Sequence, residues 1–327
     1  MRLTTSADTV DTAEVAEMAD AANAEAAPLL RLETINQQTS GARIVGMGLA
    51  QRVALKTDRN GSPYLALTVL CADGGTVEAR WWRYPYATDR CPEQGVIWLL
   101  DAHVSRYQGV PKLQLVSAAP AAESVEDIET VMSAFVRTSY RPLTELQQEL
   151  EVLISELDTE LASLVRAVLS GDVYERYCEW PAAQSHHGAV RHGLLAHSIR
   201  VARLAQRIAD AYGPGMLPHD AALVTAATLL HDIGKIATLP RIAGGALPDE
   251  GFQLDHVTRS VLMTQAAAAR LDTSVSEERL ANLLHTIAAH HGAREWGAPV
   301  EPHSVEAWLV HVADLAEARL WQWSEEA

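Results

Sequence analysis

The chain has 327 residues, of which 48% are hydrophobic and 21% charged, a composition with room for two hydrophobic cores. Its formal net charge of -16 argues against broad attraction to nucleic acid, because the summed field repels phosphates, but a local basic channel or a metal ion is compatible with it. No apolar run approaches the roughly 20 residues that span a bilayer, and the three cysteines form no CxxC pair, so we expect a cytoplasmic protein without a membrane partner.

Residues 1–30 combine acidic side chains with many alanines and predict a disordered acidic tail. From residue 31 to residue 118 the pattern changes to short alternating segments, RVALKTD, YLALTVL, TVEARWW, GVIWLLDAHVSRY and PKLQLVSA, separated by turn signals such as Asn60–Gly61. About five strands in so short a region favour a small closed barrel, and the OB-fold is the commonest barrel of that size.

OB-folds often hold single-stranded nucleic acid through stacked aromatic rings and basic side chains. The candidate contacts of this kind are Tyr64, Arg80, Trp81, Trp82, Arg83 and Tyr107. Because successive side chains of a strand point to opposite faces, at most one of Trp81 and Trp82 belongs to the core. Packing of the aromatic rings against a neighbouring domain is the structural alternative.

Residues 119–128 form a polar linker, and no strand signal returns in residues 129–327. Apolar residues recur there at three- and four-residue spacing, which predicts helices. The stretch TELQQELEVLISELDTELASLVRAVLS indicates a helix or a helix pair, and further helices are predicted over 160–175, 190–212, 219–231, 254–271, 276–290 and 303–322. We therefore expect a multidomain protein, a small all-β OB-fold barrel followed by an all-α helical bundle.

The stretch from Asp220 to Ala237 is apolar on almost every face before its last turn, which is typical of a helix buried on all sides. Its last turns contain His231 and Asp232, followed closely by Lys235, one of only three lysines in the chain. An imidazole and a carboxylate at the end of a buried helix are costly unless they are compensated. A bound metal ion and a simple His–Asp hydrogen bond are both adequate compensation.

Twelve of the 13 histidines lie in the predicted helical region; His103 is the exception. One buried histidine is usually satisfied by hydrogen bonds, but so many imidazoles in an acidic bundle favour a shared cause. His197 shares its helix face with apolar residues, and Asp314 lies among apolar neighbours on the last helix. Histidine and carboxylate ligands without cysteine suit Mn, Fe, Co, Ni or Zn better than a structural thiolate site.

The order His197, His231–Asp232, His256, His290–His291, Asp314 resembles the HD-domain phosphohydrolase superfamily. Within it, PAAQSHHGAVRHGLLAHS, LLHTIAAHHGAREWGAPVEPHSVEAWLVHVADLAEAR and GSPYLALTVLCADGGTVEARWW resemble the YhaM-type 3'-to-5' exoribonucleases, which join an N-terminal OB-fold to a C-terminal HD domain. The resemblance covers residues 31–322. The chain departs from the family pattern at Gly188, Val190, His192, Ala196, Leu315, Ala316 and Glu317.

The resemblance implies two divalent ions, with Mn as the first choice and Fe, Co, Ni or Zn as alternatives. One ion would be held by His197, His231, Asp232 and Asp314, and the second by Asp232, His256 and His290, with His291 as a further candidate. Asp232 would then bridge the two ions, which would activate a water for attack on a phosphodiester. Lys235 would neutralise a phosphate oxygen, and His187 would contact phosphate or protonate the leaving ribose oxygen.

The activity that this resemblance implies is 3'-to-5' digestion of single-stranded RNA, with single-stranded DNA as a further substrate, releasing nucleoside 5'-monophosphates. The barrel would hold the upstream strand. A hydrolase of small or cyclic nucleotides, which the net charge favours, and a non-catalytic nucleic-acid-binding protein are the alternatives. The sequence leaves open the native metal and the formation of a homo-oligomer.

Overall fold

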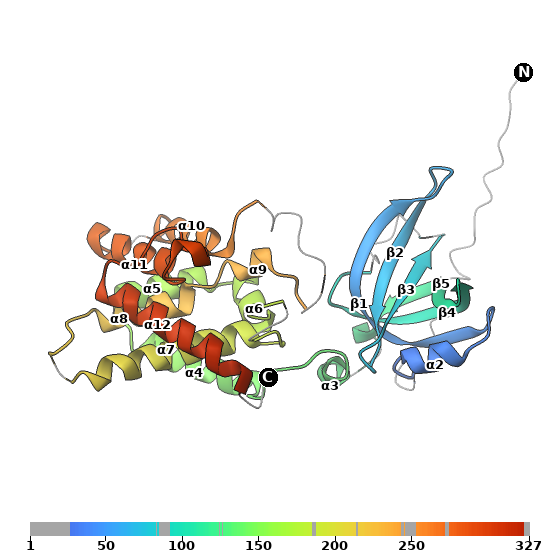
Figure 1. Ribbon diagram of the computed structural model, residues 1–327, viewed down its shortest axis with the longest axis horizontal. Coiled ribbons are helices and arrows are strands. Elements are labelled where there is room, and N and C mark those ends of the chain that lie inside the picture. The colour runs from blue at the N-terminus through green and yellow to red at the C-terminus, as the bar shows by residue number, and fades with distance from the viewer. Residues whose placement is uncertain are drawn as a thin grey trace, which may run out of the picture. The chain divides into compact units, whose positions relative to one another are not determined.

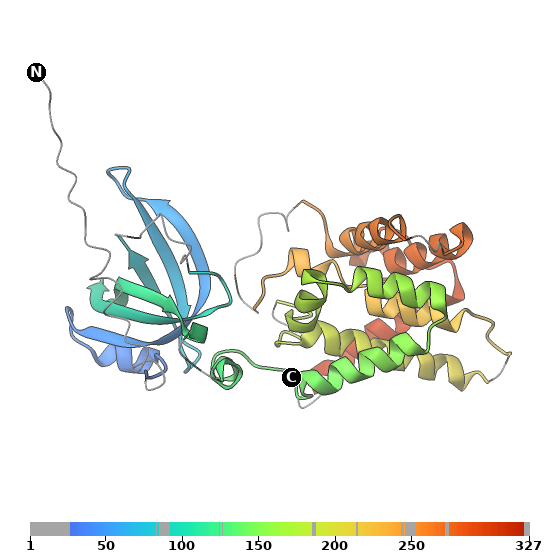
Figure 2. The same ribbon diagram turned by 180° about the vertical axis from the view of Figure 1, so that it is seen from behind.

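The computed structural model describes residues 27–82, 84, 92–123, 125, 127–184, 188–213, 215–242, 245, 253–271 and 275–323. The chain divides into two compact units between Phe135 and Val136. In Figure 1 the first unit carries the strands, in blue to green, and the second carries the long helices, in green to red. The same elements are seen from behind in Figure 2.

The first unit is a closed barrel of five strands, β1 (Arg43–Thr57), β2 (Pro63–Leu70), β3 (Thr76–Trp81), β4 (Ile97–Tyr107) and β5 (Val110–Pro120). Around the barrel the strands follow the order β1-β2-β3-β5-β4, antiparallel except for the parallel pair β3 and β5. This is the five-stranded Greek-key arrangement of an OB-fold, which confirms the predicted class of the first domain. The short helices α2 (Leu32–Gln37) and α3 (Ile128–Ser133) also belong to this unit.

The turn predicted at Asn60–Gly61 joins β1 to β2. Gly61 has a φ of 81°, a left-handed conformation that glycine adopts without steric cost. The side chain of Asp58 accepts the backbone N–H groups of Asn60 and Ser62 at 2.8 Å. Along β2 the side chains then alternate, with Leu65, Leu67 and Val69 buried in the barrel, as the period of two predicts.

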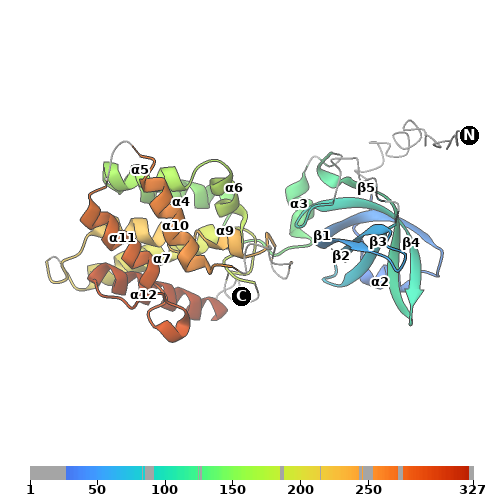
Figure 3. The same ribbon diagram turned by 90° about the horizontal axis from the view of Figure 1, so that it is seen from above.

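The second unit is a bundle whose helices are α4 (Leu143–Ser155), α5 (Thr159–Val168), α6 (Asp172–Glu179), α7 (Gly193–Ala211), α8 (Ala221–Leu230), α9 (Lys235–Thr238), α10 (His256–Ala268), α11 (Glu277–Ala289) and α12 (Val305–Leu320). Helix α7 packs against both α8 and α12, as Figure 3 shows from above. Aspartate and serine side chains accept the first free N–H groups of several helices and fix where these begin, at Asp158, Asp220, Asp255, Ser276 and Ser304.

Helix α8 lies in the centre of the bundle core, and every residue from Leu223 to Leu230 is buried. The single helix predicted over 160–175 is wrong, because α5 ends at Val168 and α6 begins at Asp172. Between them Gly171 has a φ of 54°, which interrupts a right-handed helix. Among the described residues, no helix is long and apolar enough to cross a membrane.

Candidate metal centre

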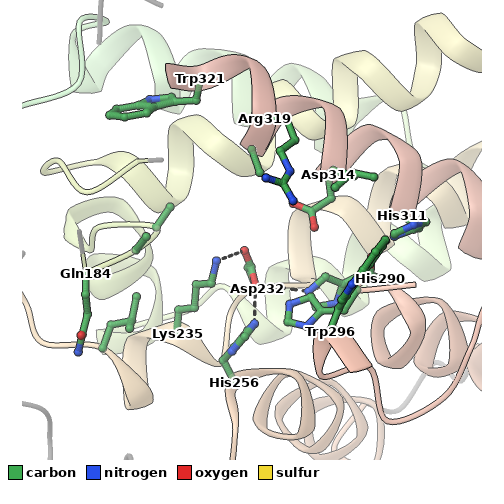
Figure 4. A pocket seen from close by; sticks show the side chains of 16 residues that line it. Gln184, Asp232, Lys235, His256, His290, Trp296, His311, Asp314, Arg319 and Trp321 are labelled. Carbon is green, nitrogen blue, oxygen red and sulfur yellow. Dashed lines mark hydrogen bonds and ion pairs between the residues drawn. The ribbon is translucent and has the colours of Figure 1, made fainter. Parts of the chain in front are cut away.

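The predicted ligands converge because four of them lie at or just beyond helix ends. His231 follows the last residue of α8, His256 is the first residue of α10, and His290 and His291 follow α11. His197 and Asp314 project toward them from within α7 and α12. Figure 4 shows part of this cluster, with Asp232 between His256 and Lys235 and Asp314 nearby.

The first group of ligand atoms surrounds one point. The Nε2 atoms of His197 and His231 are 3.2 Å apart, and Oδ2 of Asp232 lies 3.2 Å from each. Oδ1 of Asp314 lies 3.2 Å from Nε2 of His197 and 3.8 Å from that of His231. All four side chains therefore direct a nitrogen or an oxygen to the same small volume.

The hydrogen bonds behind these rings fix which nitrogen can bind a metal. Nδ1 of His231 donates to the carbonyl of Thr228 at 2.8 Å, so the neutral ring keeps a lone pair on Nε2. Nδ1 of His197 lies 2.6 Å from a carboxylate oxygen of Glu317, which likewise leaves Nε2 as an acceptor. Two imidazole acceptors that face each other cannot satisfy one another, but both can bind a cation placed between them.

A second group faces the other carboxylate oxygen of Asp232. Its Oδ1 lies 3.4 Å from Nε2 of His256 and 3.7 Å from Nε2 of His290. His256, His290 and His291 bring one ring nitrogen each within 4.8 Å of one another. Among the described residues, Oδ1 of Asp232, Nε2 of His256 and Nδ1 of His291 are buried without a hydrogen-bond partner. Buried polar atoms are rarely left in this state, so the donor set fits a second divalent ion with Asp232 between the two.

The charge states of Asp232 and His256 suit cation binding. Burial raises the pKa of Asp232, but Lys235, His231 and His197 together hold it well below its ordinary value, so the carboxylate is ionised. Burial lowers the pKa of His256 to about 4 against the opposing effect of Asp232. This ring is therefore neutral at pH 7 and has a lone pair to donate. Burial lowers the pKa of His231, but the carboxylates beside it, Asp232 first, outweigh this and raise it to about 9, so without a cation the ring is protonated at pH 7 and a metal ion would displace its Nε2 proton.

Lys235 donates from Nζ to Oδ2 of Asp232 at 2.5 Å. This places its charge next to the candidate metal ligands and on the lining of the cavity that contains them. The role expected from the sequence, contact with a phosphate oxygen, therefore stays a prediction. His187 lies outside the described residues, and so does Arg83.

Sequence reasoning missed Glu317 as a member of the site. Its carboxylate is buried between His197 and Arg200, whose Nε donates to it at 2.7 Å. Burial raises the pKa of Glu317, but His197 and Arg200 outweigh this and lower it to about 2. The available signal was spacing, since Glu317 lies three residues after Asp314 on the same helix face.

The candidate nucleic-acid contacts fall into three places. The rings of Tyr64 and Trp82 lie 4.4 Å apart on the outer face of the barrel, and the guanidinium of Arg80 lies 5.8 and 5.6 Å from their centroids. Tyr107 is exposed next to the hairpin between β4 and β5, with the ammonium of Lys112 5.3 Å from its ring centroid. Trp81 as a contact is a wrong prediction, because its ring is 6% exposed and belongs to the barrel core.

Comparison with known proteins identifies the class of the helical unit. Residues 194–319 match the family model described as HD domain, so this unit contains an HD domain, which follows the OB-fold barrel in the chain. HD domains are metal-dependent, in agreement with the ligand clusters.

Individual relatives span most of the chain. It is similar to the 3'-5' exoribonuclease YhaM of Bacillus velezensis and to that of Bacillus subtilis, each 28% identical over 261 residues, which is 80% of this chain and 80% of the relative. It is also similar to the 3'-5' exoribonuclease YhaM of Listeria monocytogenes, 29% identical over 267 residues, or 81% of both chains.

Proposed function

We propose that this protein is a metal-dependent 3'-to-5' exoribonuclease that shortens single-stranded RNA, with single-stranded DNA as a further substrate, and releases nucleoside 5'-monophosphates. The observation that carries the proposal is the position of Asp232, which directs one carboxylate oxygen to each of two groups of imidazole ligands. The similarity to the exoribonuclease relatives over both domains supports this substrate class.

In this proposal His197, His231 and Asp314 would hold one ion together with Asp232, whereas His256, His290 and His291 would hold the other with it. Two divalent ions held there, with Mn as our first choice, would supply an activated water and would neutralise the charge that develops on the phosphate. Lys235 holds the carboxylate of Asp232 in place through its hydrogen bond.

The remaining candidates bind or protonate the substrate. The neighbouring rings of Tyr64 and Trp82, with Arg80 next to both, give the barrel a surface on which bases of the upstream strand stack. His187 contacts the phosphate or protonates the leaving ribose oxygen.

The test follows a 5'-labelled single-stranded RNA after addition of Mn²⁺. The wild-type protein should produce a ladder that shortens from the 3' end, and Asp232→Ala should abolish it, because both ions lose their shared ligand. The exposed Asp172, which pairs with Arg176 on α6, supplies the matched control Asp172→Ala. A ladder that persists in Asp232→Ala would refute the two-metal assignment.

Hydrolysis of small or cyclic nucleotides is the second candidate, and the net charge of -16 favours it. A parallel assay with cyclic and triphosphate mononucleotides separates the two. Turnover of mononucleotides with an intact RNA oligomer would assign the small-nucleotide activity instead. If the protein binds an RNA oligomer but shows neither activity, it is a non-catalytic nucleic-acid-binding protein.

A further inference from the structure

The metal ligands occupy only part of the cavity in which they lie. The cavity has a volume of about 890 Å³, within the range of about 300 to 1,000 Å³ that holds small organic ligands. Its lining includes the candidate ligands Asp232, His256, His290 and Asp314. It also includes side chains that are not candidate metal ligands. These are Gln184, Trp296, His311, Arg319 and Trp321, all of which Figure 4 labels.

Helix α12 carries the cavity lining away from the ligands. Asp314, Ala318 and Trp321 all line the cavity and follow one another at spacings of four and three residues, so they share one face. Trp321 is seven positions after Asp314, which corresponds to about 10 Å along a helix. In Figure 4 Trp321 lies at the edge of the cavity opposite Lys235 and Gln184. The backbone positions of Trp321 and Asp314 are thus about one or two nucleotide lengths apart along the helix axis.

A cation accompanies this ring. Arg319 lines the same cavity, is exposed, and makes no ion pair with any residue in the described part of the chain. Lys235, by contrast, is already paired with Asp232. An exposed guanidinium beside a cavity offers up to two parallel hydrogen bonds to a phosphate group. Such a cation in a chain of net charge -16 favours an anionic ligand locally.

We propose that Trp321 and Arg319 form a nucleotide subsite, in which the indole stacks on the base next to the reacting phosphate and the guanidinium binds the adjoining phosphate. The proposal rests on the phosphodiesterase function given above. Every base has an aromatic face, so a tryptophan platform holds the substrate without selecting its sequence. An enzyme that removes successive nucleotides from any RNA requires recognition of this kind.

The decisive experiment removes the base rather than only the tryptophan. Three oligouridine substrates carry a 5' label and either no abasic site, one at the 3'-terminal position, or one at the penultimate position. At one of these positions base removal should lower kcat/KM of the wild-type protein on the order of 10-fold, the size of one base-stacking contact. Trp321→Ala should show the same loss on the intact RNA and no further loss on that abasic RNA, because both changes remove one interaction.

Trp323 supplies the matched control, since it lies two residues further on, is 82% exposed, and is absent from the cavity lining. Trp323→Ala should have the wild-type kcat/KM on the intact RNA, and base removal should lower its kcat/KM as much as it does for the wild type. If Trp321→Ala lowered kcat/KM by the same factor on the intact RNA and on both abasic RNAs, the tryptophan and the base would act independently, and this would overturn the subsite. Wild-type protein that shortens no RNA would instead refute the proposed function itself.

Two further readouts exclude a merely structural effect. Shortening of an oligomer that is abasic at both the 3'-terminal and the penultimate positions should be equal in Trp321→Ala and wild type, and a further loss there would overturn the stacking role. For Arg319→Ala, binding of the intact oligomer in EDTA should weaken, and the slope of log K against log salt should become shallower by about 0.7, the contribution of one phosphate contact on a single strand. An unchanged slope would remove Arg319 from the subsite.

Discussion

Nδ1 of His197 lies 2.6 Å from Oε2 of Glu317, although the two residues are 120 positions apart in the chain. The other oxygen of this carboxylate accepts the Nε–H of Arg200 at 2.7 Å. A carboxylate behind a metal-binding imidazole fixes the orientation of the ring and raises its basicity. We therefore infer that Glu317 positions Nε2 of His197, the candidate ligand atom.

We expect Glu317→Gln to weaken Mn²⁺ binding about 10- to 100-fold, the usual effect of losing such a partner. The amide oxygen can still accept the Nδ1 proton, so the fold should be kept while the charge is lost. Titration calorimetry on metal-free protein measures the change. Glu306 is a buried acid of the same helix that accepts the N–H of Asp220, so Glu306→Gln is the control and should leave Mn²⁺ affinity unchanged. Equal affinities of Glu317→Gln and wild type would contradict the positioning role.

Gly292 ends the segment that carries His290 and His291, and it has a φ of 81°. A Cβ atom added there would lie 2.2 Å from Cε1 of His311. Gly213 has the same φ of 81° with no atom within 4 Å of such a Cβ, so the two positions differ in space and not in backbone conformation. We expect Gly213→Ala to cost about 1 to 2 kcal/mol in the free energy of unfolding, which is the left-handed penalty alone.

Gly292→Ala should cost clearly more than Gly213→Ala and should also weaken Mn²⁺ binding, because the added methyl group displaces His311 or the segment that carries two candidate ligands. Urea denaturation of both variants gives the comparison. Equal losses in the two variants would mean that His311 moves aside at no cost.

Arg279 joins the caps of two helices. It donates to Asp158, the N-cap of α5, at 2.5 Å and to Asp220, the N-cap of α8, at 2.7 Å. The hydrogen bond from Arg279, the largest influence, lowers the pKa of Asp158. Burial raises the pKa of Asp220, but Arg279 and the N–H of Leu223 outweigh it and lower the value overall.

A lowered carboxyl pKa gives stability that is fully present above the ordinary aspartate pKa of about 3.9 and is lost as the pH falls through the lower folded value. We expect Arg279→Ala to reduce the free energy of unfolding at pH 7 by about 1 to 2 kcal/mol, discounted because these side chains are partly exposed to solvent. Below about pH 4 the difference from wild type should shrink. A difference that stays constant down to pH 2.5 would show that the ion pairs contribute nothing.

The sequence predicted those parts of the site that follow from local pattern. The apolar run before His231 predicted a buried helix because burial on all sides leaves no polar face in the sequence. The pairing of Glu317 with His197 depends on how α12 packs against α7, and no local pattern contains that packing. The same holds for Trp321, whose place in the cavity depends on where α12 lies in the bundle.

Backbone conformation explains why the single helix predicted over residues 160–175 is two helices in the structure. The periodicity of apolar residues continues from α5 into α6 and predicted one helix. Periodicity does not report the φ of Gly171, and glycine within a helical pattern is tolerated often enough that it does not by itself predict a break.

Trp81 and Trp82 are adjacent in the chain but have different surroundings, so one is expected to affect stability and the other binding. Trp81 is 6% exposed in the barrel core, and Trp82 is 43% exposed, with its ring against Tyr64 and its Nε1 donating to Gln114 at 2.5 Å. The alternation of side chains along a strand predicts that the two rings face opposite ways. It does not predict which ring faces inward, because that depends on the pairing of β3 with β2 and β5.

We expect Trp81→Ala to destabilise the barrel by about 3 to 5 kcal/mol, the cost of emptying a buried tryptophan site. Trp82→Ala should leave the unfolding midpoint nearly unchanged and weaken the binding of a single-stranded RNA oligomer on the order of 10-fold, because one stacking platform is lost. Chemical denaturation and fluorescence anisotropy in EDTA on the full chain measure the two effects separately. Wild-type affinity in a folded Trp82→Ala protein would exclude this face of the barrel as the surface that holds the strand.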